Sequence, residues 1–137
     1  KRLKEMAYGL PIYFHGPYQP DELPEVLSQI DCVVLPSRWY ESFGITIREA
    51  IRAKRPVIVS GIGAFKEAVV HLKNGLLFSP GDTYELREMM EKLATHPELA
   101  DSLVESGIEV EALDKHCEKL REIYEEAVLA YSDKRQI

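Results

Sequence analysis

The sequence predicts an α/β protein in which a parallel β-sheet is flanked by helices. Four short runs of apolar residues are continuous and end at a breaker or a small polar residue, which is typical of strands buried on both faces: residues 12–14, 32–35, 57–59 and 76–78. Amphipathic stretches lie between these runs, at residues 21–29, 45–54 and 64–71. Because strands and helices alternate along the chain, we expect the strands to run parallel.

Only helices are expected after the last strand. Asp82 and Glu85 have the spacing of a capping box and predict a helix that runs to about Thr95. Pro97 is a good first-turn residue and predicts another helix, which ends near Gly107. A long final helix is predicted by apolar residues at three- and four-residue steps: Leu113, Cys117, Leu120, Tyr124, Ala127, Val128 and Tyr131. Core packing is the simplest interpretation of this stripe, and a dimer or interdomain contact is the alternative.

Composition narrows the class of protein. The chain has 137 residues, of which 45% are hydrophobic, and this length fits one domain without a membrane span. The formal net charge of −6 argues against a general nucleic-acid or anionic-membrane surface. Cys32 and Cys117 show neither metal-ligand nor redox spacing, so we interpret both as buried thiols in a reducing cytosol. The first residues lack an initiator Met and look like the end of a helix, so we expect a piece of a longer protein.

The segment after the second predicted strand is the candidate ligand site. Ligands of parallel α/β sheets bind at the carboxyl ends of the strands, and this segment contains Glu41 and Gly44 before a predicted helix. Amides at a helix start can face an anion, and Glu49 lies about 6 Å along the helix axis from Ile45. Two carboxylates with such amides between them suit a sugar joined through a diphosphate to a ribose. A capping or solvated role for Glu41 is the alternative.

A longer pattern surrounds these two glutamates. Glu41 and Glu49 are separated by seven residues, and the neighbouring segments are Leu35-Pro36-Ser37, Phe43-Gly44, Arg55-Pro56-Val57-Ile58-Val59, Gly63-Ala64-Phe65-Lys66-Glu67, Asn74-Gly75-Leu76-Leu77-Phe78 and Pro80-Gly81-Asp82. In this order and spacing they resemble the signature of the family 4 (group 1) retaining glycosyltransferases, in the C-terminal nucleotide-sugar-binding domain of the GT-B fold. The resemblance covers about residues 12 to 93.

The resemblance implies a Rossmann-like parallel sheet and a domain that spans residues 1–137, truncated at its N-terminus, with residues 97–137 as its terminal helices. By comparison with the family, the chain would keep the last four strands of a six-stranded sheet and lack a central one. Such a sheet would expose apolar edges and unpaired backbone groups. We therefore expect that another chain or fragment fills the gap, or that the sheet rearranges or dimerises.

The resemblance also assigns roles to individual residues. Glu41 would be the catalytic residue that contacts hydroxyls of the transferred sugar, and Glu49 would accept hydrogen bonds from the ribose. The amides of Phe43 and Gly44 would lie near the sugar and the diphosphate. The remaining residues of the nucleotide pocket would be Ile45 and Thr46 near the phosphate oxygens, Ser37 and Gly16 at the edge, and His15 near the base.

The sequence departs from the family's pattern at several positions. Ala64 replaces the second Gly of the Gly-Gly-x-x-Glu segment that ends at Glu67, which would tighten the loop without removing the site. Lys54 stands where a Gly is common, so we expect a different turn after the helix. The family's diphosphate-neutralising Arg and Lys belong to an earlier segment that this chain does not match. We interpret the basic residues near the site as solvated or salt-paired: Arg38, Arg48 and Lys66.

If the resemblance holds, the protein transfers a sugar from a nucleoside diphosphate donor to an acceptor hydroxyl and keeps the anomeric configuration. We expect no cofactor and no metal, since the sequence contains no Asp-x-Asp motif. We expect the isolated chain to be inactive without an N-terminal acceptor domain, and to form a homo-oligomer if its sheet or terminal helix is exposed. The expected location is cytoplasmic, and a lipid-linked or polysaccharide acceptor would place the protein at the inner membrane face.

Alternative functions remain open. Another GT-B enzyme, such as a nucleotide-sugar epimerase, would share the fold and the donor pocket. A noncatalytic interaction module could keep the fold without activity. A glycoside hydrolase that uses Glu41 and Glu49 is less favoured, because the helix-start amides around them suggest a phosphate ligand.

Overall fold

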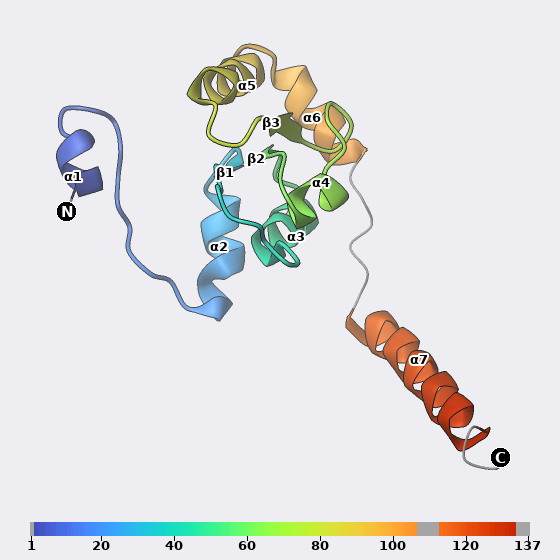
Figure 1. The fold of residues 1–137 in the computed structure, drawn as a ribbon. Helices are drawn as coiled ribbons and strands as arrows, with labels where there is room; N and C mark the ends of the chain where they lie inside the picture. The colour runs from blue at the N-terminus through green and yellow to red at the C-terminus, as the bar shows by residue number, and fades with distance from the viewer. Residues whose placement is uncertain (1, 107–112, 134–137) are drawn as a thin grey trace.

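The computed structural model describes residues 2–106 and 113–133 and contains a parallel sheet of three strands. The strands are β1 (Val33–Leu35), β2 (Val57–Ser60) and β3 (Leu76–Phe78), and they lie in the order β1-β2-β3. In the register, Val33 lies opposite Val57, and Ile58 lies opposite Leu76. The predicted α/β class with a parallel sheet is confirmed (Figure 1).

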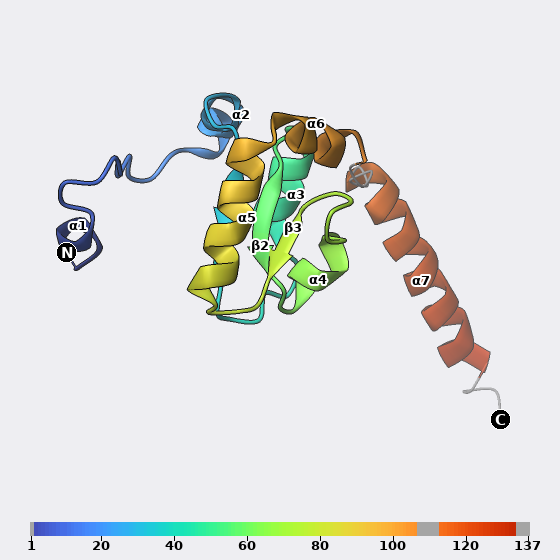
Figure 2. The same ribbon diagram turned by 90° about the horizontal axis from the view of Figure 1, so that it is seen from above.

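Helices cover both faces of the sheet (Figure 2). One face carries α3 (Ile45–Arg52) and α4 (Ala64–Ala68), and the other carries α5 (Thr83–Thr95) and α6 (Pro97–Glu105). Before β1 lie a short α1 (Arg2–Met6), a 3₁₀ turn (Pro20–Glu22) and α2 (Leu23–Ser28). Arg55, just before β2, fixes the end of α2, since its guanidinium donates to the carbonyls of Leu27 (2.7 Å) and Ser28 (3.2 Å).

The core is divided between the two faces by the alternation of side chains along β2. Val57 and Val59 pack with Ile47 of α3 and Phe65 of α4. Ile58 points the opposite way and forms a second cluster, whose other buried members are Leu76, Phe78 and Leu103. All four residues of β2 are buried, which explains why Val57, Ile58 and Val59 form a continuous apolar run before Ser60.

The prediction of a strand at residues 12–14 is wrong. This segment is irregular, and Ile12, Tyr13 and Phe14 are 50%, 80% and 47% exposed. Within residues 2–106 and 113–133, β1 pairs only with β2, so no neighbouring strand offers hydrogen bonds to residues 12–14. The sheet therefore has three of the four expected strands, and one side of β1 is an unpaired edge in the described part of the chain.

The expected change of geometry after α3 is also wrong. Lys54 has a φ of 55°, so it adopts the left-handed conformation that a Gly would supply. The Lys54 amide donates to the Ile51 carbonyl (3.0 Å), and the Arg55 amide donates to the Ala50 carbonyl (2.9 Å). These two hydrogen bonds form a Schellman motif, which closes the helix with a Lys in the strained position.

The start of α5 confirms Asp82 as its cap but not the reciprocal capping box. Asp82 accepts hydrogen bonds from the amides of Tyr84 (2.9 Å) and Glu85 (3.0 Å). The Glu85 carboxylate instead accepts from the Ser79 amide (2.5 Å), which lies before the cap. The turn after β3 is therefore tied to α5 by both carboxylates.

The helix predicted at residues 64–71 ends at Ala68 because Asn74 takes over the backbone groups beyond it. The buried Asn74 amide donates to the Ala68 carbonyl (2.9 Å), and its oxygen accepts from the Val70 amide (2.6 Å). The position of Gly107, the expected end of the helix that begins at Pro97, lies outside the described residues.

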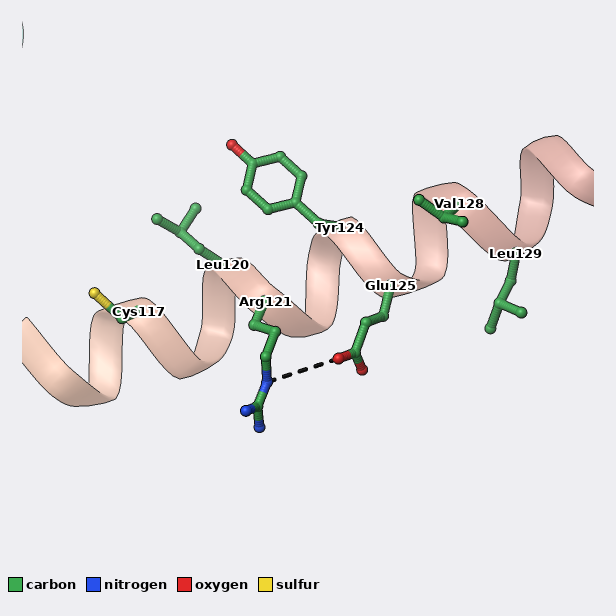
Figure 3. A pocket seen from close by; sticks show the side chains of 7 residues that line it. All are labelled: Cys117, Leu120, Arg121, Tyr124, Glu125, Val128 and Leu129. Atoms are coloured by element: carbon green, nitrogen blue, oxygen red, sulfur yellow. Dashed lines mark ion pairs between the residues drawn. The ribbon is translucent and has the colours of Figure 1, made fainter.

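The final helix, α7 (Leu113–Asp133), is present, but its apolar stripe is not in the core. Residues from Asp114 to Tyr131 are all exposed, and α7 lies apart from the sheet in both ribbon views. Figure 3 shows Cys117, Leu120, Tyr124 and Val128 along one side of α7, with an Arg121–Glu125 ion pair (3.7 Å) on another. Core packing of this stripe is therefore wrong within the described structure. In residues 2–106 and 113–133, no helix is long and apolar enough to cross a membrane.

The two thiols differ, so the prediction that both are buried is wrong for Cys117. Cys117 is exposed on α7, whereas Cys32 is half-buried beside β1. Burial, together with the neighbouring Asp31 carboxylate, raises the pKa of the Cys32 thiol to about 11. At neutral pH the Cys32 thiol is therefore protonated and unreactive.

Candidate functional site

A hollow of about 400 Å³ lies where β1 ends and α3 begins. Such a volume suits a small-molecule ligand. The hollow is lined by residues from the β1 end, the following loop, the α3 start and α4: Leu35, Pro36, Ser37, Glu41, Ser42, Phe43, Gly44, Ile45, Thr46 and Phe65. Six of the predicted site residues are among them: Ser37, Glu41, Phe43, Gly44, Ile45 and Thr46.

The start of α3 is open toward a ligand. Gly44 occupies the N-cap position with a φ of 69°, and no side chain caps the helix. The first-turn amides of a helix have no partner within the helix, and they carry its positive dipole end. Because Ile45 and Thr46 both line the hollow, these amides can hold an anionic ligand there.

Glu41 lies in the mouth of the hollow, and its side chain is exposed. Among the residues that the structure describes, no hydrogen bond or ion pair engages its carboxylate. The carboxylate is thus free to accept hydrogen bonds from ligand hydroxyls. Its backbone, in contrast, is fixed, because the Ala64 amide donates to the Glu41 carbonyl (3.2 Å).

The other predicted residues lie elsewhere. Glu49 is half-buried one turn along α3 and does not line the hollow. His15 and Gly16 belong to the irregular segment before α2, and they too are outside the hollow. The ring of His15 lies near the ring of Tyr13, with ring centroids 6.5 Å apart. The structure therefore brings together the α3 part of the predicted site and leaves the His15 part separate.

The three basic residues near the site have different roles in the structure. Arg48 supports the loop, because its Nε donates to the Phe43 carbonyl (3.3 Å) and its guanidinium lies 4.1 Å from the centroid of the Phe43 ring. Arg38 lies against the turn at Gly81 instead of forming an ion pair, and Lys66 runs along Gly61. Within residues 2–106 and 113–133, none of these three cations forms an ion pair, so they are not salt-paired there.

Two supporting residues could not be identified from the sequence. Ser60, at the end of β2, is fully buried, and its hydroxyl donates to the Ser37 carbonyl (2.5 Å). Phe65 lies under Gly44, where an added β-carbon would be 3.3 Å from the ring. In the sequence, Ser60 is marked only as a polar residue at the end of an apolar run. Phe65 has the pattern of an ordinary core residue.

In the described ranges, no group of three or more His, Cys, Asp and Glu side chains is placed to hold a metal ion. The arrangement at the start of α3 offers hydrogen bonding by open amides and by a free carboxylate, and the α3 dipole is available to a negative charge.

Comparisons with known proteins identify the family of this chain. The family model described as "Glycosyl transferases group 1" matches residues 1–110. An uncharacterized glycosyltransferase of Methanocaldococcus jannaschii is 31% identical over 109 residues, which are 77% of this chain and 31% of that protein. The chain spans between 16% and 31% of the length of the curated relatives that we compared.

Solved structures share the fold. Sucrose-phosphate synthase from Thermosynechococcus elongatus has a TM-score of 0.84 at 26% identity, over 94% of this chain and 34% of that one. The Anabaena protein HepE, solved in complex with UDP, has a TM-score of 0.61 at 27% identity, over 64% of this chain and 24% of that one. The chain therefore belongs to the group 1 glycosyl transferases and has the fold of their GT-B nucleotide-sugar-binding domains.

Proposed function

We propose that this chain binds a nucleoside diphosphate sugar and, within a complete protein, transfers its sugar to an acceptor hydroxyl with retention of configuration. The observation that carries the proposal is the uncapped start of α3 beside the free Glu41 carboxylate, in one hollow. This arrangement offers an anion site and a hydroxyl-binding group side by side. The presence of UDP in the related Anabaena structure supports a nucleotide ligand.

The proposed mechanism is stabilisation of charge as the donor separates. The first-turn amides of α3 hold the diphosphate, and the dipole of α3 favours the negative charge that grows on it as the glycosidic bond breaks. Glu41 accepts hydrogen bonds from hydroxyls of the sugar ring as that ring becomes positive. Interactions that strengthen as these charges develop raise turnover more than they raise affinity.

Glu49 is assigned to the ribose. Glu49 lies one turn along α3, and in this proposal the ribose lies beside it. A hydrogen bond from a ribose hydroxyl to a carboxylate is worth about 1.5–3 kcal/mol in a water-excluded site. Glu49 therefore contributes to donor binding rather than to the chemical step. His15 near the base and Gly16 at the pocket edge are part of the same proposal, and they require the segment before α2 to lie closer to α3.

The proposal includes no cofactor. Its partners are the donor and an acceptor domain supplied by the complete protein, in a cytoplasmic location or at the inner membrane face. The isolated chain is expected to be inactive, because the proposal assigns acceptor binding to the other domain. A homo-oligomer through the β1 edge or α7 is the expected form of the isolated chain, since within the described residues β1 has an unpaired edge and α7 is exposed.

The test is a transfer assay on the complete protein with uridine, guanosine and adenosine diphosphate sugars and a panel of acceptors. We expect one donor class to be consumed and the product to keep the donor's anomeric configuration in its proton NMR spectrum. A free sugar product of inverted ring stereochemistry would indicate an epimerase. Absence of binding to every nucleotide sugar by calorimetry would indicate a noncatalytic module. Rapid transfer by residues 1–137 alone would contradict the expected inactivity.

A further inference from the structure

Gly63 lies in the turn between β2 and α4, and its backbone is in close contact with the loop that carries Glu41. Its φ of 52° and ψ of −139° form a conformation that residues with a side chain rarely adopt. A β-carbon at Gly63 would lie 3.1 Å from the carbonyl oxygen and 3.3 Å from the amide nitrogen of Glu41. It would also lie 3.3 Å from Cδ1 of the Tyr40 ring. The absence of a side chain at position 63 thus lets the two loops approach each other.

The same turn holds the Glu41 loop at two further points. The amide of Ala64 donates to the Glu41 carbonyl (3.2 Å), and the Phe65 ring lies under Gly44 at the start of α3. Ala64 and Phe65 are buried, at 5% and 3% exposure, so these contacts come from the rigid part of the fold. Both ends of the loop from Glu41 to Gly44 therefore rest on the turn at residues 63–65.

Within the described residues, no hydrogen bond or ion pair holds the Glu41 side chain. Its side chain is exposed, and its neighbours Trp39 and Tyr40 are 81% and 83% exposed. The position of its carboxylate is consequently set by the backbone, which Gly63 and Ala64 contact directly at Glu41, while Arg48 supports the loop further on, at Phe43. We propose that Gly63 is a positioning residue for Glu41, a role that rests on the proposed function of Glu41 at the sugar.

The test compares single and double variants of the complete protein in steady-state transfer assays. Gly63→Ala would push the Glu41 backbone by a few tenths of an ångström, and misplacement of that order lowers turnover by about tenfold. We expect kcat to fall by about that factor while the KM for the donor changes by less than about twofold. Since Gly63 acts through Glu41, the Gly63→Ala change should not lower kcat further in a Glu41→Ala background.

Two further variants separate positioning from folding. Val57→Ala, at the opposite end of β2, removes part of a fully buried side chain that does not line the hollow, so it should lower the melting temperature and leave kcat unchanged. If the Gly63→Ala variant fails to fold, the Ala64→Pro variant is tested in its place. Proline suits the first position of a helix, and it removes the amide hydrogen that Glu41 accepts. Its expected kinetic signature is the same as that of Gly63→Ala.

Unchanged kcat in the folded variant would overturn the positioning role. An equal loss of kcat in the wild-type and Glu41→Ala backgrounds would also overturn it, because the effect would not act through Glu41. A wild-type protein that transfers no sugar would instead contradict the proposed function itself.

Discussion

β2 and α7 both carry apolar side chains in the pattern expected of a core, but only β2 is buried. Val57, Ile58 and Val59 are at most 1% exposed, whereas Leu120, Tyr124 and Val128 of α7 are 38%, 66% and 64% exposed. β2 lies between two strands and two helical layers, while α7 lies apart from them. The comparison teaches that periodicity predicts an element and its apolar face, but it does not identify the surface that covers that face.

The largest expected effect on stability is in the body of the fold. Ile47 of α3 is fully buried, and Ile47→Ala should lower the free energy of unfolding by about 2–5 kcal/mol, since it leaves a cavity. Urea denaturation of both proteins measures the difference. The matched control is Leu129→Ala on α7, at a residue that is 67% exposed and should change stability by less than about 0.5 kcal/mol. A loss above about 1.5 kcal/mol at Leu129 would show that α7 is covered in solution.

Gly75→Ala adds a methyl group to the packed core around β2 and so tests the packing in that core. An added β-carbon would lie 2.7 Å from Cγ2 of Val57 and 2.8 Å from Cγ1 of Val69, so these buried side chains or the backbone at Gly75 must shift. We expect a loss of about 1–3 kcal/mol in the free energy of unfolding, again from urea denaturation. At Gly9 an added β-carbon meets nothing within 4 Å, so only the backbone strain at its φ of 76° opposes a side chain there. Equal losses in Gly75→Ala and Gly9→Ala would contradict the packing of β3 on β2.

Asp82→Ala should have a smaller effect. It removes the hydrogen bonds to the Tyr84 and Glu85 amides, and loss of such a cap costs about 1 kcal/mol. The control is Asp101→Ala on α6, because the Asp101 side chain is exposed and forms no cap. Thermal unfolding of the two variants tests this, and equal melting temperatures would rule out the cap.

The last prediction concerns the accessibility of the two thiols. It is measured by the rate of alkylation and requires no substitution. With iodoacetamide at pH 8, Cys117 should react first, since it is exposed. Cys32 should react slowly, because its raised pKa of about 11 leaves little thiolate. Its rate should rise about tenfold per pH unit up to that pKa. Rapid labelling of Cys32 at pH 8 in the folded protein would contradict its burial beside β1.

Much of the fold could be predicted because local patterns determined it. The continuous apolar runs predicted β1, β2 and β3, and the Asp82 cap predicted the start of α5. The strand at residues 12–14 could not be judged locally, because a strand needs neighbours for its hydrogen bonds. Lys54 shows a different limit, since the hydrogen bonds that close α3 accompany a left-handed conformation that the residue's own preference disfavours.

The candidate site was predictable where its residues are close in the sequence. Ser37, Glu41 and Gly44 follow one strand, and the turn into α3 brings them to one hollow. Contacts between separate loops were not predictable: Ser60 with Ser37, and Gly63 with Glu41, depend on β1 and β2 being neighbours in the sheet. Each of these contacts is made to a backbone group of the partner residue. Every residue has such groups, so the pattern of side chains along the sequence does not indicate the contact.

The assignment of the α3 hollow as the donor site is tested most directly by steady-state kinetics of two variants of the complete protein. Glu41→Ala should lower kcat by about a hundredfold while the donor KM changes by only a few-fold, since Glu41 acts mainly as the sugar separates. Glu49→Ala should raise the donor KM by about tenfold or more with a smaller change in kcat, since it removes a ribose contact. If neither variant changes kcat or the donor KM, the hollow at the start of α3 is not the donor site.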